Sequence, residues 1–233
     1  MVEAILGICQ FAASIGYESQ RRLVTIYPNL ASAIDNKEIV TAEISKEVML
    51  NRLACYTEFS QLPQQFATSP WGLTDKLDGL KRRIHHLSYP TSNTSSINGG
   101  IPEEYSMISY STISKAISAV RQFGKGSWLI KRDFENAFRH VPVAPLDTRL
   151  LGFEWQGRYY AERFLPFGLR IASYIFNLFA KVFHWVVTTK LENEGILGEV
   201  VHYLDDFLAI LPPNGNPGYY RSRFAKLCRE VEL

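Results

Sequence analysis

The chain has 233 residues, of which 46% are hydrophobic and 21% charged, and its formal net charge is +2. This composition excludes a disordered or low-complexity chain, and the length allows a sizeable core in one domain or two lobes. The small net charge excludes a protein that binds nucleic acid through overall charge, although a basic cleft is compatible with a balanced surface.

Cysteine usage and hydropathy bear on the compartment. The three cysteines are scattered and lack zinc-ligand spacing: Cys9, Cys55 and Cys228. They predict free thiols in a reducing compartment, so we expect an intracellular protein of the cytoplasm, the nucleus or both. Lys181 and His184 interrupt the longest apolar run, which argues against a membrane partner. The apolar residues 4–15 lack a basic leader, so no signal peptide is expected.

The first 105 residues predict a helical start followed by irregular strands and loops. Residues 41–53 have the spacing of an amphipathic helix. Its apolar positions are expected to face inward and its charged positions to face solvent: Ile44, Val48 and Leu53 in the first group, Glu43, Lys46 and Glu47 in the second. Residues 62–105 predict strands and loops, with a polar loop at residues 91–100.

The middle of the chain alternates helical and extended patterns. Residues 112–123 predict a helix that ends at Gly124. Residues 127–133 form a short apolar strand pattern that ends in Asp133, and residues 134–139 follow as a turn into a helical piece. In residues 150–164, apolar residues alternate on both sides of Gln156-Gly157, which predicts a hairpin with its turn there.

A proline- and glycine-containing loop, Leu165-Pro166-Phe167-Gly168, precedes the longest predicted helix, residues 171–191. Four-residue steps of apolar side chains define one face of this helix: Ile171, Ile175, Phe179 and Phe183. A glycine loop that opens a helix lets a nucleotide or nucleic acid approach the backbone closely. The alternative is an ordinary junction between a loop and a core helix.

Asp205 and Asp206 stand side by side between two apolar runs, residues 200–204 and 207–211, each of which predicts a buried strand. Adjacent carboxylates repel and lose hydration beside a core, and a bound divalent cation relieves both costs. Asp133, at the end of its own strand, is the candidate third carboxylate. Three such carboxylates are what two-metal phosphoryl transfer requires.

Together these segments resemble the reverse transcriptases of retrotransposons, closest to the DIRS-type, tyrosine-recombinase group. Asp133 falls in the family's first catalytic motif, Leu165-Pro166-Phe167-Gly168 matches its substrate-binding loop, and Tyr203-Leu204-Asp205-Asp206 matches its Tyr-x-Asp-Asp box. Upstream, residues 69–73 and 82–90 are similar to the fingers of that group. The resemblance covers residues 29–211, and the motifs are specific jointly rather than singly.

The resemblance implies roles for these residues. Asp133, Asp205 and Asp206 are the expected catalytic residues and would hold two Mg²⁺ ions, with Mn²⁺ as a possible substitute. The remaining candidates are expected to bind the incoming nucleotide: Phe138 under the sugar, Phe167 and Gly168 along the base, Arg82 and Lys76 at the triphosphate. The basic run 81–83 is equally compatible with an exposed, solvated face.

The implied fold is α+β, a right-hand polymerase with fingers and palm and an antiparallel palm sheet packed on helices. The expected organisation is a helical extension at 1–60, fingers at 61–105, palm at 106–143, a fingers hairpin at 144–165 and palm again at 166–233. Only 27 residues follow Asp206, so we expect no thumb and no ribonuclease H segment.

The expected function is template-directed addition of deoxynucleotides to a primer 3′-hydroxyl on RNA or DNA. The expected partners are a template–primer, deoxynucleoside triphosphates and other proteins of a retroelement. A catalytically silent, nucleic-acid-binding remnant is the alternative, since a chain without a thumb holds a duplex poorly. An unrelated metal-dependent phosphotransferase would share the carboxylates but not the fingers motifs.

Overall fold

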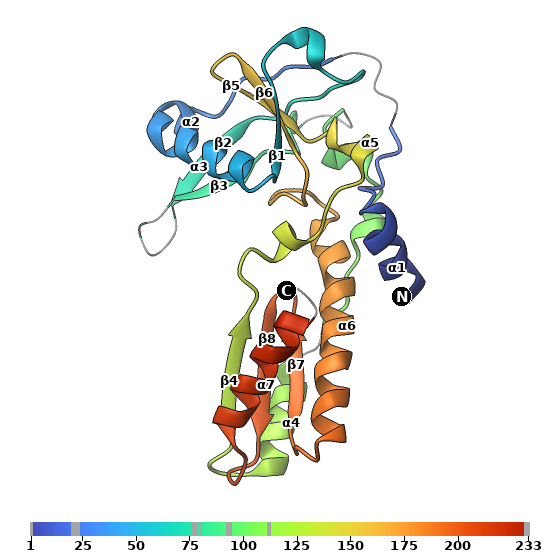
Figure 1. The fold of residues 1–233 in the computed structure, drawn as a ribbon, viewed down its shortest axis with the longest axis vertical. Helices are drawn as coiled ribbons and strands as arrows, with labels where there is room; N and C mark the ends of the chain where they lie inside the picture. The colour runs from blue at the N-terminus through green and yellow to red at the C-terminus, as the bar shows by residue number, and fades with distance from the viewer. Residues whose placement is uncertain are drawn as a thin grey trace. The chain divides into compact units, whose positions relative to one another are not determined.

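The computed structural model describes residues 2–19, 24–75, 79, 81–91, 95–110 and 113–230, which fall into two compact units (Figure 1). The first unit consists of Met1–Ile5, Ile108–Ala137 and Ile175–Leu233, and the second consists of Leu6–Met107 and Phe138–Tyr174. Each unit is therefore assembled from segments that are far apart in the sequence.

The first unit is a three-stranded antiparallel sheet with three main helices. The strands are β4 (Trp128–Asp133), β8 (Asp206–Leu211) and β7 (Glu199–Tyr203), in the order β4-β8-β7. The helices are α4 (Ile113–Phe123), α6 (Ala172–Asn193) and α7 (Pro217–Glu230). Helix α6 starts in the last residues of the second unit, and α1 (Val2–Phe11) also has residues in both units.

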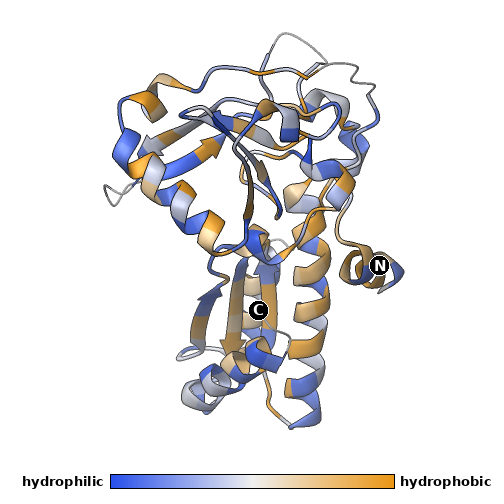
Figure 2. Ribbon diagram, turned by 45° about the horizontal axis from the view of Figure 1, so that its top comes forward, coloured by the Kyte–Doolittle hydropathy of each residue, from blue (hydrophilic) through white to orange (hydrophobic). Residues whose placement is uncertain are grey.

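Helices cover both faces of this sheet, because successive apolar side chains of each strand point to opposite faces. On one face, Ala116 and Ala119 of α4 pack against Val201 and Ile210. Phe207 points to the opposite face, since it lies three residues from Ile210 on the same strand. There it makes edge-to-face contacts with three rings from other elements: Phe134, Phe183 and Phe224. Figure 2 shows the resulting run of hydrophobic residues along α6 and the strands.

The second unit contains a three-stranded antiparallel sheet and a separate hairpin. The sheet has β1 (Leu53–Tyr56), β6 (Arg158–Glu162) and β5 (Gly152–Trp155) in the order β1-β6-β5, and the hairpin pairs β2 (Trp71–Asp75) with β3 (Lys81–His85). The helices are α2 (Ala31–Ile34), α3 (Lys37–Met49) and α5 (Pro145–Thr148). Short 3₁₀ turns lie at η1 (Phe59–Gln61), η2 (Asn98–Gly100), η3 (Glu103–Ser106) and η4 (Ala137–His140).

A buried aromatic stack forms the centre of the second unit. The Phe153 ring lies parallel to Trp71 on one side and to Tyr160 on the other, with centroids 5.2 and 5.3 Å apart. Val40 and Ile44 of α3 belong to the same core cluster. Apolar side chains from α3, β2, β5 and β6 are thus removed from water together, which stabilises the unit.

The α+β fold with antiparallel sheets is confirmed, and so are several elements. The predicted hairpin turn is Gln156-Gly157, with φ of +51° and +76°, the two positive values that a type I′ turn requires. Gly124 ends α4 at a φ of +84°. Residues 1–60 hold α1, α2 and α3 and also contribute β1 to the sheet of the second unit.

The predicted helix at residues 41–53 is wrong in its bounds and at two positions of its faces, whereas Ile44 is buried and Lys46 exposed as expected. Helix α3 runs from Lys37 to Met49, and Leu53 instead begins β1. Val48, expected inward, is 37% exposed, whereas Glu47, expected in solvent, is 4% exposed. The physical reason is that Glu47 is neutralised inside the unit by Arg83 and Arg139, so its burial is compensated.

Within the described residues, no helix is both long and apolar enough to cross a membrane.

Candidate active site

A hairpin with a two-residue turn carries the paired aspartates in the first unit. Tyr203 and Asp206 close the β7–β8 ladder, and Leu204 and Asp205 form the turn between them. Leu204 has a φ of +56°. Primed hairpin turns need a positive φ, which is uncommon for a branched residue such as leucine. The turn is therefore locally strained, a condition that concentrates at functional sites.

The third aspartate lies directly across the same sheet. Asp133 and Asp206 are register partners of the antiparallel β4–β8 ladder, so their Cβ atoms lie about 5 Å apart. The Phe134 amide donates a hydrogen bond of 3.2 Å to the Asp205 carbonyl, which ties the end of β4 to the turn. The structure thus brings all three predicted carboxylates to one end of one sheet.

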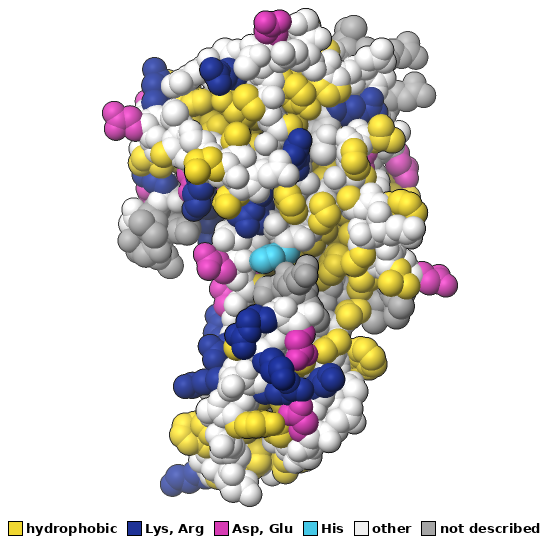
Figure 3. Space-filling model, in the orientation of Figure 1, with side chains coloured by type: hydrophobic (Ala, Val, Ile, Leu, Met, Phe, Trp, Pro, Cys, Tyr) yellow, Lys and Arg dark blue, Asp and Glu magenta, His cyan; other side chains and the backbone are white. Residues whose placement is uncertain are grey.

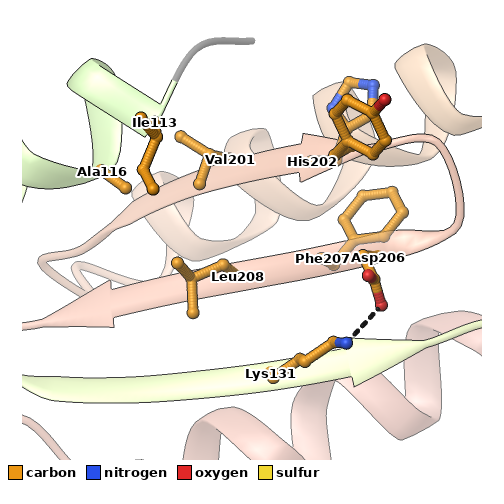
Figure 4. A pocket seen from close by; sticks show the side chains of 9 residues that line it. Ile113, Ala116, Lys131, Val201, His202, Asp206, Phe207 and Leu208 are labelled. Atoms are coloured by element: carbon orange, nitrogen blue, oxygen red, sulfur yellow. Dashed lines mark ion pairs between the residues drawn. The ribbon is translucent and has the colours of Figure 1, made fainter. Parts of the chain in front are cut away.

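These carboxylates lie in a shared electrostatic field. Partial burial raises the pKa of Asp205, and the charges of Asp133 and Asp206 raise it further. Lys131 offsets some of this charge, because its Nζ lies 2.9 Å from Asp206 Oδ1 (Figure 4). The hydrogen bond to Asp206 raises the pKa of Lys131, and Asp133 and Asp205 add to that effect.

The donor set fits a hard divalent cation. Three carboxylates offer only oxygen ligands, which Mg²⁺ and Mn²⁺ prefer, and a cation relieves the repulsion that raises the Asp205 pKa. In the described ranges, no three His, Cys, Asp or Glu side chains already converge as a ready-made cage. A cation at this site would compete with Lys131 for Asp206.

A hollow of about 340 Å³ lies beside Asp206 in the first unit. Its walls are mostly apolar and come from α4 and from the sheet face that α4 covers: Ile113, Ala116, Val201 and Leu208, with Lys131 and Asp206 at one end (Figure 4). Tyr203, at the rim, stacks on Tyr110 with ring centroids 4.3 Å apart. Of the three carboxylates, Asp206 therefore borders a concave, largely apolar surface.

The predicted nucleotide-binding residues that the structure describes lie in the second unit. Phe138 and Phe167 come together, with ring centroids 5.1 Å apart and planes inclined by 50°. Arg82 is exposed on β3, opposite Thr74 in the hairpin. Lys76 lies outside the described residues. The aromatic pair is therefore observed, while the roles of Arg82 and Lys76 at a triphosphate stay predictions.

Gly168 has a structural reason to be glycine. Its φ is +103°, and a Cβ on it would lie 2.3 Å from the backbone oxygen of His85. Asn98 Nδ2 donates to the Gly168 carbonyl at 2.7 Å, and Asn98 Oδ1 accepts from the Arg170 amide at 2.8 Å. Close packing of the loop on β3 explains this glycine without a bound nucleotide.

A buried charge cluster escaped the sequence analysis. It consists of Glu47, Arg83, His85, Arg139 and Glu162, from α3, β3, η4 and β6. The only signal in the sequence was Arg139 itself, a cation set between apolar residues in Ala137-Phe138-Arg139-His140-Val141. A buried arginine needs carboxylate partners, but nothing in the sequence pattern identifies Glu47 and Glu162 as those partners.

The comparisons with known proteins agree with this geometry. The family model described as "Reverse transcriptase (RNA-dependent DNA polymerase)" matches residues 78–214, which is more than half of the chain. That range includes Arg82, Phe138 and the three aspartates. The comparison with curated proteins gives no match.

Solved structures share the fold at low sequence identity. The native prototype foamy virus protease–reverse transcriptase is 20% identical, with a TM-score of 0.58 over 92% of this chain and 24% of that chain. The foamy viral protease–reverse transcriptase dRH in complex with double-stranded DNA is 14% identical, with a TM-score of 0.62 over 91% of this chain and 32% of that one. The same viral enzyme in complex with an RNA/DNA hybrid is 14% identical, with a TM-score of 0.57 over 92% and 24%.

This chain thus spans about a quarter to a third of the length of these solved structures. The match of the family model, the fold and the clustered aspartates lead to the same conclusion. The chain belongs to the reverse transcriptase (RNA-dependent DNA polymerase) family.

Proposed function

We propose that this chain carries out template-directed nucleotidyl transfer, adding deoxynucleotides to a primer 3′-hydroxyl on an RNA or DNA template. The observation that carries the proposal is the meeting of three carboxylates at one end of the first unit's sheet, with Asp133 opposite Asp206 and Asp205 in the adjoining turn. The first unit would serve as the palm. The DIRS-type, retrotransposon grouping stays a prediction.

Asp133, Asp205 and Asp206 would hold two Mg²⁺ ions, or Mn²⁺ in their place. When bound, these ions supply Lewis-acid activation of the primer hydroxyl and neutralise charge on the leaving pyrophosphate. The aspartates themselves contribute fixed negative charge on a rigid sheet end. Partial burial, and then the charges of Asp133 and Asp206, raise the pKa of Asp205, and a bound cation would offset both effects.

The second unit would select and orient the nucleotide. A phenyl ring at Phe138 leaves little space at its face, because Phe167 already packs on it. Such a ring excludes a ribose 2′-hydroxyl by steric contact. Arg82 would bind the triphosphate through the forked donors of its guanidinium, with Lys76 as its expected companion.

Basic side chains on the first unit would help to hold the template–primer. Figure 3 shows Lys and Arg gathered over α7, where Arg221, Lys226 and Arg229 are exposed. Phosphate contacts of this kind give salt-dependent, sequence-independent affinity. We propose that the protein acts inside the cell, in the cytoplasm or nucleus, consistent with its three free cysteines.

The test is primer extension on an RNA template with purified protein, deoxynucleotides and Mg²⁺ or Mn²⁺. Asp133→Asn and Asp205→Asn should each abolish extension while the thermal melt stays intact. The matched control is Asp35→Asn, an exposed aspartate of the second unit with the same chemical change. Extension that survives in either site variant would overturn the metal-site assignment.

The alternative is a catalytically silent remnant that binds nucleic acid through basic side chains such as those exposed on α7. A folded wild-type protein that extends no primer but binds a duplex in a salt-dependent way, with or without Asp133, would establish this alternative.

A further inference from the structure

The buried charge cluster of the second unit has no part in the proposed chemistry, yet it is costly to maintain. The side chains of Arg139, Glu162 and Glu47 are 0%, 2% and 5% exposed. Removing charges from water costs several kcal/mol per ion, and only well-made pairs offset this cost. Buried ion pairs of this kind add little net stability, so a gain in stability does not explain why the cluster is there.

Arg139 is the centre of the cluster. Its Nη1 donates to Glu162 Oε2 at 2.7 Å, and its Nη2 lies 3.2 Å from Glu47 Oε2 without hydrogen-bond alignment. Arg83 Nη1 approaches the same Glu47 oxygen at 3.0 Å. Arg52, which is partly exposed, lies 3.6 Å from the other oxygen of Glu47, so three guanidinium groups face two carboxylates.

His85 completes the cluster as a neutral side chain. Its Nε2 lies 3.1 Å from the Gly152 carbonyl, an acceptor only, so Nε2 carries the proton. Nδ1 faces Glu162 at 3.8 Å. Burial lowers the pKa of His85 to about 4, so the ring adds no charge to the cluster near neutral pH.

Arg139 also joins the two segments that carry the aromatic pair. It follows Phe138 in the chain, and its Nη1 donates at 3.3 Å to the carbonyl of Phe164, three residues before Phe167. The Leu165 amide donates to the Val141 carbonyl at 3.0 Å, so the two segments also run together beyond Arg139. One guanidinium thus connects α3, β6 and both aromatic segments.

We propose that Arg139 is a positioning residue that fixes the separation of the Phe138 and Phe167 rings and thereby sets the rejection of ribonucleotides. The selectivity in this proposal rests on the proposed polymerase function, whereas the positioning does not. Misplacement of a contact group by about 1 Å is enough to change rates by orders of magnitude. A rigid, multidentate anchor next to Phe138 is suited to prevent it.

The test variant is Arg139→Lys, which keeps the positive charge between Glu47 and Glu162. A lysine ammonium is a point charge without the planar fork, so it cannot bond Glu162 and the Phe164 carbonyl with the arginine geometry. The matched control is Arg83→Lys, the same change in the same cluster at a residue that contacts Glu47 but neither aromatic segment. Glu162→Gln is a second variant. It weakens the bond from Arg139 Nη1 by removing the negative charge, and it keeps the size and shape of the side chain.

The first readout is ring geometry, measured by fluorine NMR on protein labelled with 4-fluorophenylalanine. Phe138→Leu and Phe167→Leu assign the two resonances. Arg139→Lys and Glu162→Gln should shift both resonances, and Arg83→Lys should leave both in place. Resonances that do not move in Arg139→Lys, or that move equally in Arg83→Lys, would overturn the positioning role. If Arg139→Lys does not fold, Glu162→Gln decides the question in the same way.

The second readout is selectivity in primer extension, as the ratio of kcat/KM for a deoxynucleotide to that for the matching ribonucleotide. Arg139→Lys should lower this ratio about tenfold and raise KM for the deoxynucleotide, with kcat within about twofold of wild type. An unchanged ratio would overturn the link to selectivity. A wild-type protein that extends no primer would overturn the proposed function and this link together, and the NMR readout would still decide the positioning.

Discussion

Lys131 Nζ lies 2.9 Å from Asp206 Oδ1, so the lysine forms an ion pair with one of the three carboxylates that we assign to metal binding. Both side chains reach solvent, with exposures of 68% and 44%. The lysine therefore acts as a substitute counter-charge in the protein without metal.

Lys131→Met should make the protein more dependent on divalent cations. Without the lysine, the carboxylates repel with less compensation, so the melting temperature in chelator should fall. Added Mg²⁺ should then raise the melting temperature more in the variant than in wild type. Lys115→Met is the control, because Lys115 makes a similar pair with Glu199, 3.0 Å apart, that involves none of the three aspartates. Equal Mg²⁺ effects in wild type and Lys131→Met would contradict the assignment.

The positive φ of Leu204 predicts that the protein is most stable with glycine at this position and least stable with valine. Leu204→Gly should raise the free energy of unfolding by about 1 kcal/mol, because glycine tolerates the positive φ, and Leu204→Val should lower it by about as much. Urea unfolding followed by circular dichroism measures both. Leu197→Gly, at an exposed leucine, should give no gain. A destabilised Leu204→Gly protein would show that contacts of the leucine side chain outweigh the strain.

Gly168→Ala should destabilise the second unit by about 3 kcal/mol or more, since the new methyl group meets the His85 carbonyl at 2.3 Å and φ is +103°. Gly157→Ala is a matched control: its φ is also positive, at +76°, but no atom lies within 4 Å of the added Cβ. It should cost only about 1 kcal/mol. Tryptophan fluorescence reports on this unit through the buried Trp71 and Trp155. Equal losses in the two variants would show that the contact with β3 is unimportant.

Stability should fall as the pH falls from 6.5 towards 4. Burial lowers the pKa of His85 to about 4, against an ordinary value of 6.5, while Glu162 and the bond to Gly152 oppose this effect. In that window the unfolded chain binds a proton that the folded chain excludes, which costs on the order of 3 kcal/mol by pH 4. His202, which is half-buried, also has its pKa lowered to about 4, chiefly by burial, and adds to the decline.

His85→Gln should therefore flatten the dependence of unfolding free energy on pH between 6.5 and 4, measured by urea titration at each pH. Gly157→Ala, a destabilised protein that keeps both histidines, should retain the wild-type slope. A His85→Gln protein with an unchanged slope would show that the pKa of His85 is not lowered in the folded state.

The sequence was sufficient for the elements whose local signals and tertiary environment agree. The Gln156-Gly157 turn, the helix stop at Gly124 and the strand–turn–strand segment around Asp205 each carry their own residue chemistry. The first two appear as predicted, and the third appears with its turn one residue earlier, at Leu204-Asp205. The meeting of Asp133 with Asp206 is also observed. It was inferred from the chemistry of a metal site and then from the resemblance, because no local pattern pairs residues so far apart.

Glu47 shows why the rest was not predictable. Its helical position beside Lys46 and one turn after Glu43 predicts solvent exposure, and the arrival of Arg83 and Arg139 from distant segments reverses that preference. Gly168 is similar, since the need for glycine arises from the His85 carbonyl on another element. Both cases are tertiary effects that override local pattern.

The pairing of β4 with β8 has a consequence for biosynthesis. Asp133 leaves the ribosome about seventy residues before Asp206, with the segment 138–174 of the other unit made in between. At about 5–20 residues per second, β4 waits roughly 4–15 s for its partner. During that interval it is an unpaired edge bearing the exposed side chains of Trp128 and Leu129, so the nascent chain is most exposed to aggregation before its carboxylates first meet.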